Sequence, residues 1–351
     1  MRRVSRIAVA GCATAALAVS VSACGGTSTD ATSDDSGKSK GVAIAYDVGG
    51  KGDQSFNDAA TVGMEKAAKD FKTGQKAVEP SDGESDADKV QRLTELAKQG
   101  YNPVVGVGYA YAPAVKEVAG KFPKVTFGIV DDETVQLKNV ADLVFHEEQA
   151  SYLAGVTAAM STKSKTVGFV GGVDVPLIHK FEAGFVQGVH DTDPKVKVKS
   201  QYLTQKAEDG GFSSPDKGKD AAQGQIDGGA DVVYAAAGLS GQGVIEAASA
   251  KKVWAIGVDS DQYKQDALAK YKESILTSAT KDVAGAVYNL AKSVHDGKPA
   301  TGVVRADLKT GGVGLADSNP EFKNNTKLQA ALKKAAEGIA DGSIKVKTTT
   351  S

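Results

Sequence analysis

The sequence contains little cysteine, few aromatic residues and no excess of basic charge. Its two cysteines, Cys12 and Cys24, both lie near the N-terminus, so the rest of the chain holds no disulfide and no cysteine-based metal site. A net charge of −1 leaves no basic excess to neutralise phosphates, which argues against a nucleic-acid-binding protein. Aromatic residues make up only 6%, so each aromatic residue in a loop needs an explanation.

Residues typical of catalytic centres are also scarce. The four histidines are scattered, no two have the spacing of metal ligands, and no G-x-S-x-G elbow occurs. Neighbouring acids occur at Asp131-Asp132 and Glu147-Glu148, but adjacent side chains on a strand or helix point apart, so we interpret them as surface charges or hinge contacts. We therefore predict a protein that is not an enzyme, with no catalytic residue, no metal and no cofactor.

The N-terminal 40 residues differ in composition from the rest. Three arginines precede an uncharged apolar run at 7–21, which is too short to span a bilayer comfortably and is typical of a signal peptide. The run ends in small residues before Cys24, as in a bacterial lipobox; the alternative is an ordinary signal peptide with a coincidental cysteine. We predict a lipoprotein signal peptide at 1–23, lipidation of Cys24, and a location on the extracytoplasmic face of the cell membrane.

Residues 24–40 are almost entirely Gly, Ser, Thr, Asp and Lys, which predicts a disordered tether. From residue 41 onward, short apolar runs alternate with longer helical patterns. The apolar runs are nearly continuous, which favours parallel sheets covered by helices on both faces. We predict two doubly wound α/β lobes, the first from 41–147 plus about 259–303, the second from 148–258 plus about 304–345. We expect hinge segments near 145–149, 257–261 and 303–306.

Two segments look like copies of one unit. Residues 104–133 and 232–262 each contain an apolar run, a glycine-bearing loop, an alanine-rich helical segment and a second apolar run that ends in Val-Asp. The alternative is that any two βαβ units look alike. Ligands of doubly wound sheets bind beyond the carboxyl ends of the strands, so the loops after the strands are the candidate sites.

The loop after the first strand, residues 47–57, contains three glycines, Asp47, Phe56 and Asn57. One interpretation is structural: Asp53 or Ser55 caps the following helix and Phe56 is buried. The other makes Phe56 a stacking surface, with Asp47 and Asn57 as hydrogen-bonding groups for a planar polar ligand. The residues themselves favour neither.

Residues 52–57 (GDQSFN) resemble the signature of the basic membrane protein family, lipoproteins related to purine-nucleoside receptors that serve nucleoside ABC importers. The resemblance extends from about 41 to about 320, with further blocks in matching order at 106–109 (GVGY), 181–185 (FEAGF), 256–262 (IGVDSDQ) and 277–281 (TSATK). It implies a type I periplasmic-binding fold whose two lobes close on a nucleoside, an ABC permease and ATPase as partners, and a monomer that binds no nucleic acid.

The resemblance also implies roles for single residues. Phe56 and Phe181 would sandwich the base, Asp47 and Asn57 would contact its polar edge, and the ribose would be held by Gly238, Asp259 and Lys281. Tyr109 or Tyr111 is expected to line the cleft, but this loop lacks the polar residue that the family often has, so the preferred base stays open. A sugar-binding protein of the same fold, a lipid-anchored enzyme and an adhesion scaffold are the alternative functions.

Overall fold

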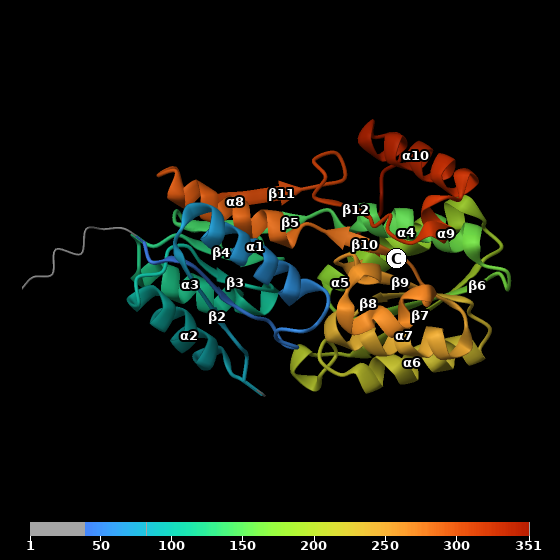
Figure 1. The fold of residues 1–351 in the computed structure, drawn as a ribbon, viewed down its shortest axis with the longest axis horizontal. Helices are drawn as coiled ribbons and strands as arrows, with labels where there is room; N and C mark the ends of the chain where they lie inside the picture. The colour runs from blue at the N-terminus through green and yellow to red at the C-terminus, as the bar shows by residue number, and fades with distance from the viewer. Residues whose placement is uncertain (1–38, 82, 351) are drawn as a thin grey trace, which may run out of the picture. The chain divides into compact units, whose positions relative to one another are not determined.

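A computed structural model describes residues 39–81 and 83–350. The predicted signal peptide, Cys24 and most of the predicted tether lie outside the described residues. From Ser39 onward the chain forms one compact unit, which contains two six-stranded sheets (Figure 1).

The first sheet forms lobe 1, and all of its strand pairs are parallel. Its order is β11-β5-β4-β3-β1-β2, from the strands β1 (Gly41–Ala45), β2 (Gly74–Val78), β3 (Val104–Gly106), β4 (Phe127–Val130), β5 (Val140–Phe145) and β11 (Gly302–Ala306). One face packs on α1 (Phe56–Phe71) and α8 (Val283–His295), and the other on α2 (Asp86–Lys98) and α3 (Ala112–Lys121). Burial on both faces explains why these strands are apolar throughout.

The second sheet forms lobe 2 and has the corresponding order, β12-β10-β9-β8-β6-β7. Its strands are β6 (Thr166–Val173), β7 (Lys197–Thr204), β8 (Val232–Ala236), β9 (Trp254–Asp259), β10 (Ile275–Lys281) and β12 (Val313–Leu315), of which only β12 is antiparallel to its neighbour. Its faces are covered by α4 (Glu147–Ser161) and α5 (Pro176–Thr192) on one side, and by α6 (Pro215–Asp227) and α7 (Gly241–Lys251) on the other. The short α9 (Pro320–Lys323) and α10 (Thr326–Ala340) pack beside α4.

The fold class predicted from the sequence is confirmed: two doubly wound lobes with interleaved helices. The chain crosses between the lobes after β5, after β10 and after β11. The first and third crossings lie beside the expected hinge segments. The second does not, because β10 pairs with β9 and therefore keeps the chain in lobe 2 until Lys281. The boundary expected near residue 259 is therefore wrong by one strand.

The two similar segments at 104–133 and 232–262 occupy corresponding positions in the two sheets. Each contains a strand, a single 3₁₀ turn, a helix and the neighbouring strand, namely β3-α3-β4 and β8-α7-β9. In the first sheet the strand order reverses between β1 and β3, and in the second sheet it reverses between β6 and β8. Such a reversal opens a crevice at the carboxyl ends of the strands, where doubly wound folds bind ligands.

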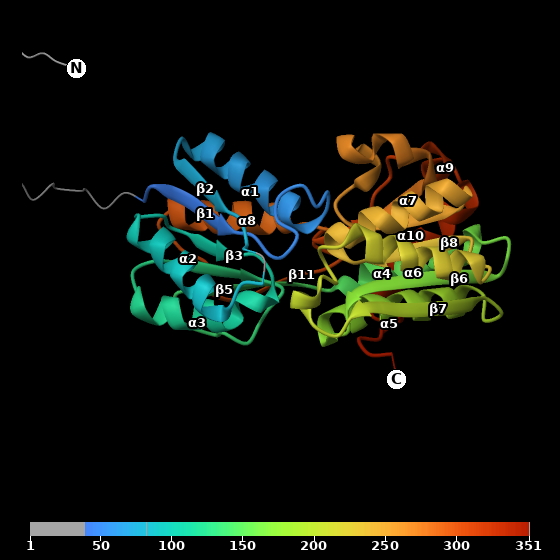
Figure 2. The same cartoon turned by 90° about the horizontal axis from the view of Figure 1, so that it is seen from below.

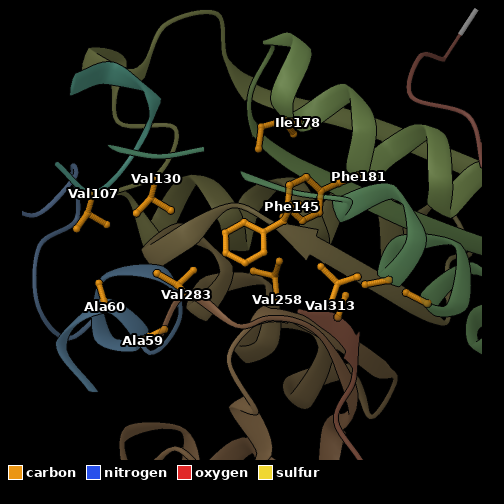
Figure 3. Close-up of a cluster of buried hydrophobic side chains, with 14 of the residues drawn as sticks. Ala59, Ala60, Val107, Val130, Phe145, Ile178, Phe181, Val258, Val283 and Val313 are labelled. Carbon is orange, nitrogen blue, oxygen red and sulfur yellow. The ribbon is translucent and has the colours of Figure 1, made fainter. Parts of the chain in front are cut away.

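The hydrophobic core continues from one lobe to the other beside the crossings. Phe145 at the end of β5 and Phe181 on α5 belong to the same buried cluster (Figure 3). Among residues 39–81 and 83–350, no helix is both long enough and apolar enough to cross a membrane.

Candidate functional site

A cavity lies at the two strand-order reversals, between the lobes. Lobe 1 contributes the loops after β1, β3 and β4 and the start of α1, and lobe 2 the loops after β7 and β8, the ends of β9 and β10, and α5. The eight ligand-binding residues predicted from the sequence all line it: Asp47, Phe56, Asn57, Tyr109, Phe181, Gly238, Asp259 and Lys281. The structure thus brings together side chains that are up to 234 positions apart in the chain.

The loop from Asp47 to Phe56 is held by the buried carboxylate of Asp53. Its two oxygens accept hydrogen bonds from the main-chain N–H groups of Ser55, Asn57 and Asp58 at 2.8–3.1 Å. Asp53 therefore satisfies the free donors at the start of α1, the structural role considered for it above. Phe56, the first residue of α1, is half-buried and lines the cavity.

Asn57 and Asp47 have different surroundings. The Asn57 Oδ1 atom accepts from the Asp47 main-chain N–H at 3.0 Å, and its Nδ2 atom lies 3.5 Å from the Asp47 carbonyl oxygen. Asn57 is thus engaged with the loop, and its contacts favour a positioning role over direct contact with a ligand. The Oδ1 atom of the Asp47 carboxylate accepts a hydrogen bond from the Val48 N–H at 2.9 Å. Burial raises its pKa to about 7, although the Val48 N–H lowers it.

Three aromatic rings surround the ammonium group of Lys281. The Lys281 Nζ atom lies 4.7 Å from the ring centroid of Phe56, 5.5 Å from that of Phe181 and 5.6 Å from that of Phe145. These distances are within the range of cation–π attraction. Phe56 comes from lobe 1 and Phe181 from lobe 2, so the two rings that we predicted as a pair approach the same point from opposite lobes.

Lys281 also joins two buried carboxylates, Asp131 after β4 and Asp259 at the end of β9. Its Nζ atom lies 2.6 Å from Asp131 Oδ2 and 3.6 Å from Asp259 Oδ1. The Asp259 Oδ2 atom accepts from the Ser55 hydroxyl at 2.7 Å. In the described part of the chain, Oδ1 of Asp131 and Oδ1 of Asp259 are buried and accept no hydrogen bond. Each carboxylate therefore has one oxygen available to a ligand donor.

The charges of this cluster are strongly coupled. Burial lowers the pKa of Lys281, but Asp131, Asp259 and Glu147 outweigh burial and raise it overall. Burial raises the pKa of Asp131 although the Lys281 ammonium opposes it, and burial together with Asp131 raises the pKa of Glu147 to about 7. Lys281 thus faces three acids, of which Glu147 also pairs with Lys180, and this excess of acids makes the site poorly suited to an anionic ligand group.

The sequence interpretation of the acid pairs is corrected here. The side chains of Asp131 and Glu147 are only 4% and 1% exposed, so neither is a surface charge. Glu147 does lie at the first crossing between the lobes, where it pairs with Lys180 at 3.7 Å. Asp131 is a cavity residue that sequence reasoning missed. The signal was present, since both similar segments end in Val-Asp and we selected only the second aspartate, Asp259.

The structure distinguishes Tyr109 from Tyr111. Tyr109 lines the cavity, and burial raises its pKa to about 12. Tyr111 is fully buried away from it: its hydroxyl donates to the Tyr46 carbonyl at 2.9 Å and accepts from Arg92 Nη1 at 2.6 Å. Tyr111 therefore supports the end of β1, directly before Asp47.

Gly238 and Phe212 close the lobe 2 side of the cavity. Gly238 follows β8 and has φ = 53°, a left-handed conformation that favours glycine. A Cβ atom at this position would lie 3.2 Å from the Phe212 carbonyl oxygen. Phe212, Leu177 and Ile178 line the cavity as well, and sequence reasoning did not find them. They lie in a loop and in the first turn of α5, where no motif marked them.

Hydrogen bonds connect the two lobes around the cavity. The Ser260 hydroxyl donates to the Ser55 carbonyl at 2.8 Å, and Gln262 Nε2 donates to the Gln54 carbonyl at 3.1 Å. At the rim, Gln242 Nε2 on α7 donates to the Gly52 carbonyl at 2.9 Å. These bonds join the loop before α1 to three separate points of lobe 2.

Two doubly wound lobes that meet around a cavity at their strand-order reversals define a two-lobed solute-binding protein. The chain belongs to the family described as ABC transporter substrate-binding protein PnrA-like, whose model matches residues 40–349. The resemblance to basic membrane proteins inferred from the sequence is therefore confirmed.

Individual relatives agree with this assignment. The chain is 35% identical to the ABC transporter nucleoside-binding protein BmpA of Lactococcus lactis, over 87% of this chain and 88% of that protein. It is 34% identical to an uncharacterized lipoprotein of Pyrococcus horikoshii, over 86% of this chain and 75% of that protein. Among solved structures, a solute-binding protein of an ABC transporter system from Aeropyrum pernix matches with a TM-score of 0.76 and 26% identity, covering 88% of this chain and 94% of that one.

Proposed function

We propose that this substrate-binding protein carries a nucleoside, with a purine preferred, and delivers it to an ABC permease and its ATPase. The observation that supports this proposal most directly is the composition of the cavity. Two aromatic rings from opposite lobes and a lysine held between two carboxylates meet in one place. A nucleoside has the matching parts, a planar heterocycle and a sugar with neighbouring hydroxyls.

The base would lie between Phe56 and Phe181. Stacking on an aromatic side chain contributes about 1–3 kcal/mol per base and tolerates different bases. The carboxylate of Asp47 would accept N–H groups from the polar edge of the base, and Asn57 would hold Asp47 in place through the main-chain contacts described above. Tyr109 lies in the same part of the cavity.

The ribose would lie against Asp131, Asp259 and Lys281. The Oδ1 atoms of the two carboxylates, which accept no hydrogen bond within the described residues, would accept its hydroxyls, and Lys281 would donate to a ribose oxygen. Hydrogen bonds to charged groups contribute roughly 1.5–3 kcal/mol each. Because the cluster already holds three acids for two lysines, Lys281 and Lys180, we expect it to bind neutral nucleosides and to reject nucleotides, whose phosphates add negative charge.

Closure would follow from contacts of both lobes with one ligand. The bonds from Ser260, Gln262 and Gln242 to the loop before α1 form only when the lobes are together, so a ligand that bridges the lobes stabilises the same form. The three crossings are the proposed hinge.

We further propose a monomeric lipoprotein attached through Cys24 to the extracytoplasmic face of the membrane. The lipobox-like sequence and the lipoprotein relative support this proposal.

Mass spectrometry of small molecules released from the purified protein tests the proposed ligand. We expect a purine nucleoside in nearly equimolar amount. A free pentose or hexose in its place would support the sugar-binding alternative, and conversion of an added nucleoside to a product would indicate an enzyme. Intact-mass analysis of the membrane-extracted chain, compared with a Cys24→Ser variant, tests lipidation separately.

A further inference from the structure

The described chain enters lobe 1 at the edge where the strands of the first sheet begin. The Ser39 hydroxyl donates to the Asn102 carbonyl at 2.6 Å, and the Lys40 main-chain N–H donates to the Gly100 carbonyl at 2.9 Å. Figure 2 shows β1 beginning at the end of lobe 1 that is remote from lobe 2. The candidate ligand cavity lies at the opposite edge of this sheet, beyond the carboxyl ends of the same strands.

This entry edge carries many exposed lysines that form no ion pair with the residues that the structure describes. Because the helices run antiparallel to the strands, their C-terminal ends and the segments that follow them gather here. We call the following exposed lysines the basic edge: Lys40, Lys72, Lys98, Lys124, Lys138 and Lys298. Within residues 39–81 and 83–350, none of them forms an ion pair, whereas the nearby acids Asp70 and Asp296 already pair with Lys66 and Lys292.

The corresponding edge of lobe 2 provides an internal comparison. It also carries exposed lysines, among them Lys163, Lys195, Lys252 and Lys272. Its acids Asp193 and Asp227 pair with Lys165 and Lys251, as Asp70 and Asp296 do with their lysines, but Asp231 and Glu273 form no ion pair within the described residues. A lysine near a helix C-terminus is favoured by the helix dipole in either lobe. The dipole therefore does not explain why, among the residues that the structure describes, the edge at which the chain enters carries more unpaired lysines than the corresponding edge of lobe 2.

We propose that the basic edge rests on the anionic lipid headgroups of the membrane that holds the chain. The proposal builds on the lipid anchor proposed above. Only residues 25–38 separate Cys24 from Ser39, so even a fully extended chain keeps the basic edge within about 50 Å of the lipid. Each lysine near an anionic membrane surface strengthens binding about fivefold, which corresponds to about 1 kcal/mol.

Docking in this way orients the molecule. With the basic edge on the headgroups, the carboxyl ends of the lobe 1 strands point away from the bilayer. The ligand cavity then faces the surrounding solution, so the anchored protein can capture solute while it rests on lipid.

Binding to vesicles tests the proposal without the lipid anchor. The chain from residue 24 onward with Cys24→Ser retains the whole compact unit that begins at Ser39. Its binding is measured by sedimentation with vesicles of pure phosphatidylcholine, and with vesicles of two parts phosphatidylcholine to one part phosphatidylglycerol, at low ionic strength. We expect binding to the anionic vesicles only, weakening as salt is added.

Matched variants locate the contact. Changing Lys72, Lys98, Lys124 and Lys298 to Gln should weaken binding to the anionic vesicles at least tenfold. The same change at Lys163, Lys195, Lys252 and Lys272 should weaken binding to the anionic vesicles less than twofold. Lys72 and Lys252 have matching positions in the two lobes, since each follows the last residue of a helix and has a positive φ. Equal binding to both kinds of vesicle, or equal losses in both variants, overturns the proposal. Nucleoside affinity is measured separately on the same proteins. If they bind no nucleoside, the proposed ligand is contradicted but the proposed membrane contact is not.

Discussion

Asp131 and Asp259 are equivalent residues of the two lobes that meet at one lysine. Asp131 directly follows β4 and Asp259 is the last residue of β9. Both have a positive φ, of 67° and 60°, and both lie beside the Nζ atom of Lys281. Non-glycine residues seldom adopt this left-handed conformation, and where they do the strain is commonly found at functional sites. The conformation turns both carboxylates from the strand ends into the space between the lobes.

A substitution at Asp131 tests whether the newly found residue contributes to binding. Asp131→Asn removes a charged acceptor, and we expect the nucleoside Kd to rise about 10- to 150-fold, the equivalent of roughly 1.5–3 kcal/mol. Asp132→Asn is the control, since the Asp132 side chain accepts from Thr134 and does not line the cavity. Calorimetric titration should show its Kd unchanged within twofold. Equal effects of the two variants would exclude the proposed role of Asp131.

The two aromatic residues should differ in their effect on stability. Phe56→Ala and Phe181→Ala should each weaken nucleoside binding by about 1–3 kcal/mol, through loss of stacking. Phe181 is 4% exposed and part of the core, so its truncation should also lower the free energy of unfolding by about 3–5 kcal/mol. Phe56 is half-buried and its truncation should cost less. Urea denaturation and calorimetry of both variants separate the two effects; unchanged affinity in Phe56→Ala argues against the sandwich.

Nucleoside binding should depend on the ionisation of Asp47. Burial raises its pKa to about 7, and the proposed contact requires the carboxylate as an acceptor of base N–H groups. Affinity should therefore be highest above pH 7 and about tenfold lower at pH 6 than at pH 8. Glu147 titrates in the same range, so the informative quantity is the difference between the wild type and Asp47→Asn. A profile of the same shape in both proteins would reject the contact.

Ionisation of the Asp47 carboxyl group should strengthen nucleoside binding but lower the free energy of unfolding. Because the folded-state pKa of Asp47 lies above its unfolded value of about 3.9, folding favours the protonated form. Its favourable contribution is complete below pH 4 and is lost as the pH rises to about 7. The wild type should accordingly lose stability relative to Asp47→Asn over this interval, as chemical denaturation at a series of pH values would show.

The rim hydrogen bond from Gln242 to Gly52 should slow ligand release. Gln242→Ala removes one bond specific to the closed form, and we expect the dissociation rate to increase about 2- to 12-fold, as for a bond that contributes 0.5–1.5 kcal/mol. Gln223→Ala on α6 is the control, because Gln223 donates only to Asp227 in the same helix. Stopped-flow fluorescence measures both rates. Identical rates in the two variants would show that the rim contact does not contribute to closure.

Much of the fold followed from patterns in the sequence. The apolar runs and helical periodicity predicted that short strands alternate with helices from residue 41 onward, as they do in the structure, but they did not predict every element. The helix α4 was missed because it is buried on most sides and therefore lacks an amphipathic pattern. The strand β10 was missed as well, and with it the second crossing, because polar residues such as Thr277 and Ser278 interrupt its apolar character.

The candidate site was predictable where a motif marked it. The resemblance identified eight positions, and all of them line one cavity. It did not show that Asn57 holds the main chain of Asp47, because that contact depends on how the loop folds. Nor did it indicate Phe212 or Asp131, because neither residue falls in one of the matching blocks.

Isothermal titration calorimetry with a purine nucleoside and with free ribose tests the central claim most directly. The account predicts one nucleoside bound per chain, with ribose at least 30-fold weaker, since ribose lacks a base and so loses stacking of about 2 kcal/mol or more. Ribose or another free sugar binding as tightly as the nucleoside, or no heat of binding with any purine nucleoside, would contradict it.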